Sequence, residues 1–131
     1  MREIKFRGKP IEDYGDVKWF YGNAVINYDD KLAYIEAVRQ GYVPVEWESI
    51  GQYTGLKDKN GQEIYEGDIV VDGRENSAEV VFDDGCFCVI GYLGDLRTHP
   101  LRDSLFCGER FEVIGNIYEN PELLEASHAS K

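Results

Sequence analysis

The chain has 131 residues, 43% of them apolar and 30% charged, which is enough to bury the core of one ordinary domain. Aspartate and glutamate outnumber lysine and arginine by 25 to 14, so the net charge is −11 at pH 7. Such an acidic balance opposes direct nucleic-acid binding, which requires clustered cations. No apolar run reaches the roughly 20 residues that cross a bilayer, and residues 1–10 lack a secretory signal pattern. We therefore expect a cytoplasmic protein without a membrane segment.

The first ten residues differ in charge from the rest of the chain. They carry a net charge of +3, which leaves −14 for residues 11–131. Apolar and basic residues alternate along this segment, and alternation predicts a strand. We expect Ile4 and Phe6 to face a core, with Lys5 and Arg7 facing outward toward acidic groups on the same body or on another copy.

Runs rich in β-branched and aromatic residues predict further strands along the chain. They cover residues 17–28, 69–71, 78–82, 86–92 and 111–118. Residues 30–39 fit either a strand or a helix, and the β-like flanking segments favour a strand. One helical turn within residues 45–50 and a short helix after Asn120 and Pro121 complete the predicted elements.

These elements predict a mainly β or α+β fold. We expect a single small domain over residues 1–125, with a bent sheet or small barrel and one or two short helices. Residues 126–131 lack apolar bulk and predict a disordered tail. The expected core is formed by Ile69, Val80, Phe82, Val89 and Val113.

The polar stretch GQYTGLKDKNGQEIYEGDIV, residues 51–70, is the most unusual segment. Residues 58–61, Asp-Lys-Asn-Gly, predict a hairpin with a type I′ turn, in which both central residues take positive φ. Residues 66–68 predict a second turn. A calcium loop is excluded, because its first and last ligand positions would fall on Leu56 and Gly67.

The thiols and imidazoles do not form a recognisable reactive group. Cys86, Cys88, Cys107 and His99 could supply four zinc ligands, but their spacing matches no zinc motif. We interpret the cysteines as reduced packing residues. No nucleophile elbow or phosphate loop occurs. We therefore expect a protein that is not an enzyme and has no metal or other cofactor.

Four blocks of the sequence together resemble the YopX family. They are REIKFRGK at the start, WFYG at 19–22, IGQYTGLKDKNGQEIYEGDIV at 50–70 and FEVIGNIYENPELL at 111–124. The resemblance implies a protein carried by temperate phages or prophages that acts inside the bacterial host cell. The family supplies no catalytic residues to transfer, and it makes self-association plausible.

We therefore expect a non-enzymatic phage accessory protein that self-associates or binds a host or phage protein. One alternative is an acidic nucleic-acid mimic that inhibits a host DNA-binding protein. Another is a small-ligand binder or enzyme using the 51–68 loop, and the sequence leaves open whether this loop is functional or structural. The candidate interaction residues are Trp19, Tyr21, Tyr53, Lys57, Asp58, Glu63, Glu66 and Asp68.

Overall fold

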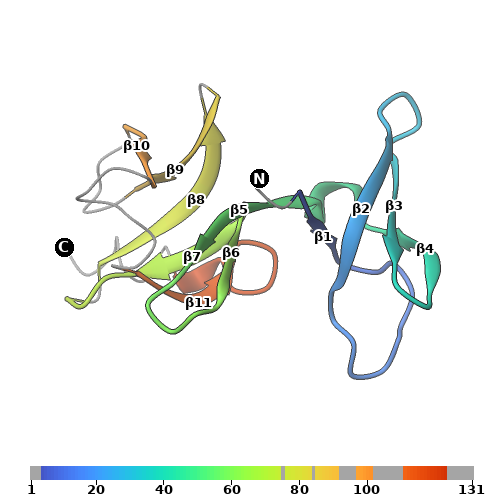
Figure 1. The fold of residues 1–131 in the computed structure, drawn as a ribbon, viewed down its shortest axis with the longest axis horizontal. Coiled ribbons are helices and arrows are strands. Elements are labelled where there is room, and N and C mark those ends of the chain that lie inside the picture. The colour runs from blue at the N-terminus through green and yellow to red at the C-terminus, as the bar shows by residue number, and fades with distance from the viewer. Residues whose placement is uncertain (1–3, 75, 84, 92–96, 102–110, 124–131) are drawn as a thin grey trace. The chain divides into compact units, whose positions relative to one another are not determined.

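The computed structural model describes residues 4–74, 76–83, 85–91, 97–101 and 111–123 (Figure 1). Almost all regular structure within these residues is antiparallel β, which confirms the predicted fold class. The chain divides into two compact units, which we call the N-terminal unit, Met1–Tyr53, and the C-terminal unit, Thr54–Lys131. A single domain would require the two units to unfold cooperatively as one, which their compactness does not establish. The single domain over residues 1–125 therefore stays a prediction. None of the described helices is long and apolar enough to cross a membrane.

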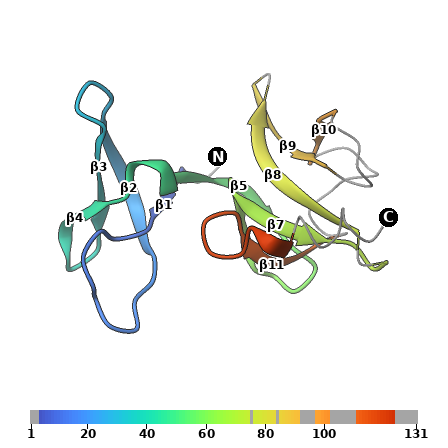
Figure 2. The same cartoon turned by 180° about the vertical axis from the view of Figure 1, so that it is seen from behind.

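The N-terminal unit is built on a β-meander, in which each strand pairs with the next (Figures 1 and 2). The strand order is β4-β3-β2-β1-β5. Its elements are β1 (Phe6–Gly8), β2 (Phe20–Asn27), β3 (Leu32–Ala37), β4 (Gly41–Val45), the 3-10 turn η1 (Trp47–Ser49) and the start of β5 (Gly51–Lys57). The predicted helical turn within residues 45–50 is therefore confirmed as η1.

Residues 30–39, which the sequence left ambiguous, contain strand β3. Apolar and exposed residues alternate along it with period two, so Ala33, Ile35 and Ala37 are buried. Their inner face packs with Phe20, Val43 and Val45 in a small core, of which two of the six members are alanine. A core of such small side chains buries little apolar area for a unit of this size.

Strand β1 differs from its prediction in two ways. Ile4 is 63% exposed, whereas Arg7 is buried with its guanidinium 4.6 Å from the centre of the Trp19 ring. An aromatic face can receive a cation that the sequence pattern alone would place in water. In addition, β1 pairs with β2 on one side and β5 on the other, so it has no edge with which to align another copy.

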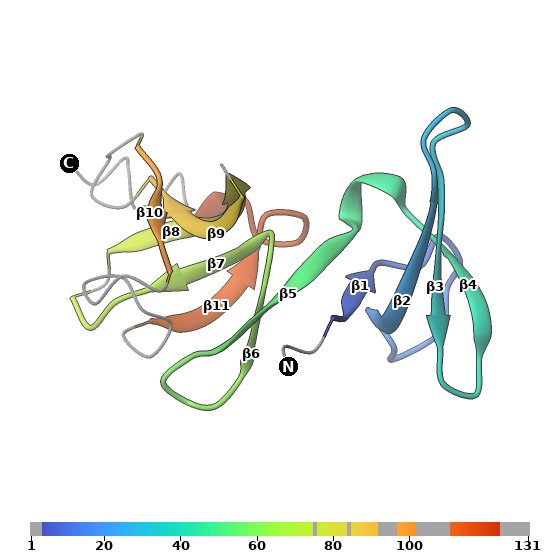
Figure 3. The same ribbon diagram turned by 45° about the horizontal axis from the view of Figure 1, so that its top comes forward.

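The C-terminal unit holds a second antiparallel sheet with strand order β10-β9-β8-β7-β11 (Figure 3). It begins with the hairpin of β5 and β6 (Glu63–Tyr65). The sheet strands are β7 (Asp68–Val71), β8 (Ser77–Asp83), β9 (Cys86–Ile90), β10 (His99–Pro100) and β11 (Glu112–Asn116). The predicted strands at 69–71, 78–82, 86–92 and 111–118 are thus confirmed, with boundaries shifted by a few residues.

The predicted core is largely confirmed in the C-terminal unit. Val80 and Val89 are fully buried in one cluster, and Val113 packs against it. Phe82 is the exception: it is 53% exposed because it lies near the end of β8, where its ring contacts Phe87 edge-on at 5.0 Å between centroids. Ile69 is buried, but its position in the strand faces the opposite side of the sheet from Val80.

The predicted short helix after Asn120 has its first residues, Glu122 and Leu123, within the described part of the chain. Its continuation and the predicted tail at 126–131 lie outside the described residues. So does Cys107, the third cysteine.

Candidate interaction surface

The β-meander presents an apolar face to solvent, which we call the outer face. The cross-strand register aligns Val25 of β2, Tyr34 of β3 and Pro44 of β4 in one row. Directly opposed residues on antiparallel strands share a face, and residues two apart along a strand do so as well. The apolar members of the outer face are therefore Tyr21, Val25, Leu32, Tyr34, Tyr42 and Pro44.

Four of these six side chains are highly exposed for apolar residues, and the other two, Tyr34 and Pro44, are half-buried. Tyr42 is 62% exposed and Val25 is 48% exposed, and Tyr21 and Leu32 are similar to Val25. Among the β2, β3 and β4 positions on this face, all of them described, only Glu36 carries a charge. An almost uncharged face is unusual in a chain with 30% charged residues. Exposed apolar patches of this kind mark interaction surfaces.

The three predicted aromatic contacts all fall in the N-terminal unit, but only one of them is on the outer face with high exposure. Tyr21 is on that face and opposes Arg7 across the strands. Trp19 is half-buried and lies over Arg7. Tyr53 is buried, and the Nζ atom of Lys5 lies 5.3 Å from its ring centre. Trp19 and Tyr53 thus serve as packing surfaces for the two cations.

Asp58, a predicted interaction residue, is buried and holds the backbone together. Its Oδ1 atom accepts hydrogen bonds from the backbone N–H groups of Asn60 and Gln62, each at 2.8 Å. Its Oδ2 atom accepts the N–H of Val113 at 3.0 Å, on strand β11. A single carboxylate therefore fixes the turn and ties it to the edge strand β11.

These bonds also explain why the predicted turn class is wrong. The hairpin forms where expected, between Lys57 and Glu63. However, Gly61 has φ of +83°, whereas Asn60 is not among the described residues with positive φ. The carboxylate of Asp58 holds the Asn60 N–H in place, and a side chain that bonds its own backbone two residues on favours an Asx-type turn over type I′.

The remaining predicted residues of the 51–68 loop also contribute mainly to structure. Asp68 is buried, and its Oδ2 atom accepts the N–H of Tyr65 at 2.7 Å. Glu63 is half-buried and accepts a hydrogen bond from the Tyr65 hydroxyl at 3.0 Å. Glu66 is half-buried, and Lys57 is exposed. The loop therefore directs its two buried aspartates inward, toward its own backbone.

The carboxyl group of Glu79, in the C-terminal unit, has a shifted pKa. Burial raises the pKa of Glu79 above its ordinary value, and repulsion by the charge of Glu66 raises it further. Sequence reasoning missed Glu79, because its position in β8 looks like an ordinary polar residue on an alternating strand.

His99, which we considered and dismissed as a zinc ligand, lies apart from the described cysteines Cys86 and Cys88. His99 pairs with Val89, whose side chain lies on the opposite face of β9 from Cys86 and Cys88. Among the described residues, no group of three histidine, cysteine, aspartate or glutamate side chains could hold a metal ion. The two cysteines are free thiols with their sulfurs 3.3 Å apart. Burial, then the hydrogen bond and charge of Cys86, raise the pKa of Cys88 to about 11.

The comparisons with known proteins agree with the resemblance of the sequence blocks. A search of curated proteins found no significant match. A solved structure, the crystal structure of protein EF1440 from Enterococcus faecalis, is similar with a TM-score of 0.54 and 28% sequence identity. The similarity covers 95% of this chain and 99% of that one. The family model described as YopX protein matches residues 5–125. The chain therefore belongs to the YopX family.

Proposed function

We propose that this protein is a phage- or prophage-encoded accessory protein without catalytic activity, which acts inside the host cell by self-association through its outer face. The observation that carries the proposal is the apolar row of Val25, Tyr34 and Pro44 across three strands. A second copy of the same chain is the occupant that best fits this face. Two sheets that stack face to face bury such rows between them.

The small inner core supports this choice of occupant. With two alanines and two valines among its six buried members, it gives the N-terminal unit little apolar burial of its own. A second sheet on the outer face would supply a second layer of apolar contacts at roughly 25 cal/mol per Å² of buried area. Six of the nine outward positions on β2, β3 and β4 are apolar and only Glu36 is charged, so the face can pair with its own copy with little opposition of like charges, as an isologous twofold contact requires.

The size of the face sets the expected strength. Three strands about 4.8 Å apart and five residues long at about 3.4 Å per residue span roughly 14 by 17 Å. A stable interface buries about 800 Å² on each partner. The outer face is smaller than that, so association should be weak and depend on concentration.

The acidic-mimic alternative needs a surface of negative charge, and the outer face with its single Glu36 does not provide one. The alternative that uses the 51–68 loop needs carboxylates directed at a ligand, whereas Asp58 and Asp68 bond to backbone N–H groups. The loop contacts favour self-association over a ligand site in the 51–68 loop, and the outer face argues only against a mimic that would use that same face.

Sedimentation or light scattering between about 5 and 500 μM tests the proposal. The mass should rise above the 15.0 kDa of one chain as the concentration increases. Val25→Asp places a charge in the centre of the apolar row and should keep the protein monomeric over the whole range. The matched control is Val38→Asp, because Val38 is 87% exposed just beyond the end of β3 and off the row. A monomeric wild-type protein throughout, or equal masses for Val25→Asp and wild type, would contradict the proposal.

A further inference from the structure

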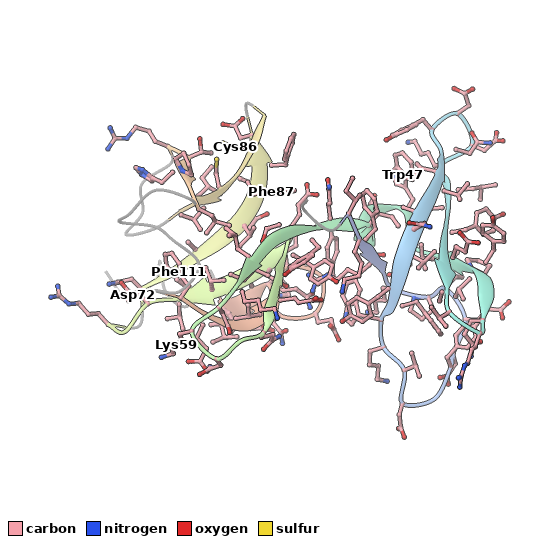
Figure 4. All side chains as sticks on the ribbon, in the orientation of Figure 1. Trp47, Lys59, Asp72, Cys86, Phe87 and Phe111 are labelled. Carbon is pink, nitrogen blue, oxygen red and sulfur yellow. The ribbon has the colours of Figure 1, made fainter. Side chains whose placement is uncertain are left out.

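Two thiols lie together at the start of β9, in the C-terminal unit (Figure 4). Cys86 and Cys88 are two residues apart, so both side chains project from the same face. Their sulfurs are 3.3 Å apart, and both lie near the backbone oxygen of Asp83, at 3.5 Å from Cys86 and 3.9 Å from Cys88. Cys86 is half-buried and Cys88 is buried. One sulfur of the pair is therefore accessible from solvent.

The spacing is unfavourable for a disulfide. Residues two apart on a strand have Cα atoms about 6.4–6.8 Å apart, at the upper limit of the range that a disulfide spans. The sulfurs would have to approach to about 2.05 Å, which is more than 1 Å closer than they are, with the backbone held in the β8–β9 ladder. Closing this bond would strain the strand.

A single bridging cation instead requires the two sulfurs to move apart. Two metal–sulfur bonds of about 2.3 Å, nearly in line as in a two-coordinate site, separate the sulfurs by roughly 4.6 Å. Rotation of the half-buried Cys86 side chain away from Cys88 can provide the difference from 3.3 Å without moving the backbone. Zinc prefers four protein ligands in such sites, and the described residues offer no third one nearby. Thiolates also select copper(I). This soft cation forms stable two-coordinate sites with two sulfur ligands.

We propose that Cys86 and Cys88 form a two-thiol site for a soft monovalent cation of the copper(I) class. On binding, two S–H bonds break and two sulfur–metal bonds form, while two protons leave to solvent. No electron is transferred, and the bridged pair carries one negative charge. Burial and the neighbouring Cys86 raise the pKa of Cys88 to about 11, with Thr98 acting in the opposite direction, so the cation must displace this proton when it binds. Thr98 donates its one hydroxyl proton to the Asp83 carboxylate at 2.8 Å.

The proposal adds a metal to a chain for which the sequence led us to expect none, and it does not make folding depend on the metal. The thiols are already held together by the β8–β9 ladder, so the site needs no cation to form. Binding should strengthen as the pH rises, because each bound cation displaces two protons.

Titration of the reduced chain with copper(I) under nitrogen, against a coloured copper(I) chelator, tests the site. The Cys107→Ser variant is the background, so that only the pair under study can supply two thiols. It should bind one equivalent of copper(I). Adding Cys86→Ser should weaken binding at least 100-fold, and circular dichroism should show an unchanged fold because Cys86 is half-buried.

Two further measurements sharpen the test. Val81→Ala changes the residue that pairs with Cys88 on β8 and retains both thiols, so it should still bind one equivalent. Between pH 6 and pH 8 the affinity of the Cys107→Ser chain should rise. Equal affinity in Cys107→Ser with and without Cys86→Ser, or no binding by Cys107→Ser itself, would overturn the proposal.

Discussion

The two units of this protein each bury an apolar core, but they differ in how many large apolar side chains they expose. Among the described residues, nine of the large exposed apolar side chains belong to the N-terminal unit and two, Phe82 and Ile114, to the C-terminal unit. The C-terminal unit instead buries the carboxylates of Asp58 and Asp68 and bonds them to backbone N–H groups. The polar stretch at residues 51–70 therefore contributes mainly internal hydrogen bonds. The exposed apolar surface lies instead in the N-terminal unit.

The largest expected effect concerns Gly22, where β2 and β3 come very close. A Cβ atom at this position would meet the backbone oxygen of Glu36 at 2.1 Å, so the strands must move apart. Gly22→Ala should destabilise the N-terminal unit by roughly 3 kcal/mol or more, as overpacking against rigid backbone does. Both tryptophans, Trp19 and Trp47, lie in this unit, so tryptophan fluorescence during urea unfolding measures the loss.

The matched control is Gly73→Ala, which has open space and no positive φ. It should leave the urea midpoint nearly unchanged. Hydrogen exchange on Gly22→Ala would also test the predicted single domain. We expect the loss of protection to concentrate in residues 1–53. An equal loss in the β7–β9 amides would show that the two units unfold as one.

The next largest effect should come from Asp58 in the C-terminal unit. Asp58→Ala removes three acceptor contacts to buried or half-buried backbone groups, including the tie to Val113. Hydrogen bonds to charged groups contribute about 1.5–3 kcal/mol each, and they are not additive, so we expect a loss of about 2–4 kcal/mol in the free energy of unfolding. Urea unfolding followed by far-ultraviolet circular dichroism measures it.

Asp72 provides an internal comparison, because it repeats the same local motif. Its Oδ1 atom accepts the N–H groups of Arg74 and Asn76, as Asp58 does two and four residues on. Asp72→Ala loses these local bonds, whereas Asp58→Ala also loses a hydrogen bond from Val113 on β11, 55 residues away along the chain. Asp72→Ala should therefore lower the free energy of unfolding by less than Asp58→Ala does. Equal costs would mean that the tie to β11 contributes nothing measurable.

The smallest effect should be the pH dependence of Glu79. Its pKa is raised in the folded protein, so ionisation is penalised there relative to the unfolded chain. The stability of the wild type relative to Glu79→Gln should thus be greatest below about pH 4.5 and fall as the pH rises through the folded-state pKa. At pH 7 the variant should melt at a higher temperature than wild type, and near pH 4 the gain should vanish.

Glu66→Gln offers a graded comparison for that experiment. Repulsion from Glu66 is the lesser of the two causes of the Glu79 shift, so this variant should recover a smaller part of the gain. Differential scanning calorimetry at both pH values measures the two changes. A gain at pH 4 equal to that at pH 7 would show that ionisation of Glu79 is not the cause.

The sequence by itself determined the β class, most strand positions, the hairpin at residues 58–61 and the family. These properties depend on neighbours along the chain: side-chain alternation, turn residues and long matching blocks. Residues 30–39 were ambiguous because their apolar residues fit both the helical period of 3.6 and the strand period of 2. Pairing with β2 and β4 makes this segment a strand. The type I′ turn was wrong because a carboxylate two residues away outweighs the Asn-Gly preference.

Only the tertiary structure decided which residues face solvent. Asp58 and Asp68 look like surface charges in the sequence, and they are buried because backbone N–H groups from Val113 and Tyr65 meet them. Val25 looks like a core residue, and it is exposed because the register places it in line with Tyr34 and Pro44 on the outer face. Alternation separates the two faces of a strand, but the packing of the sheet decides which of them becomes the core.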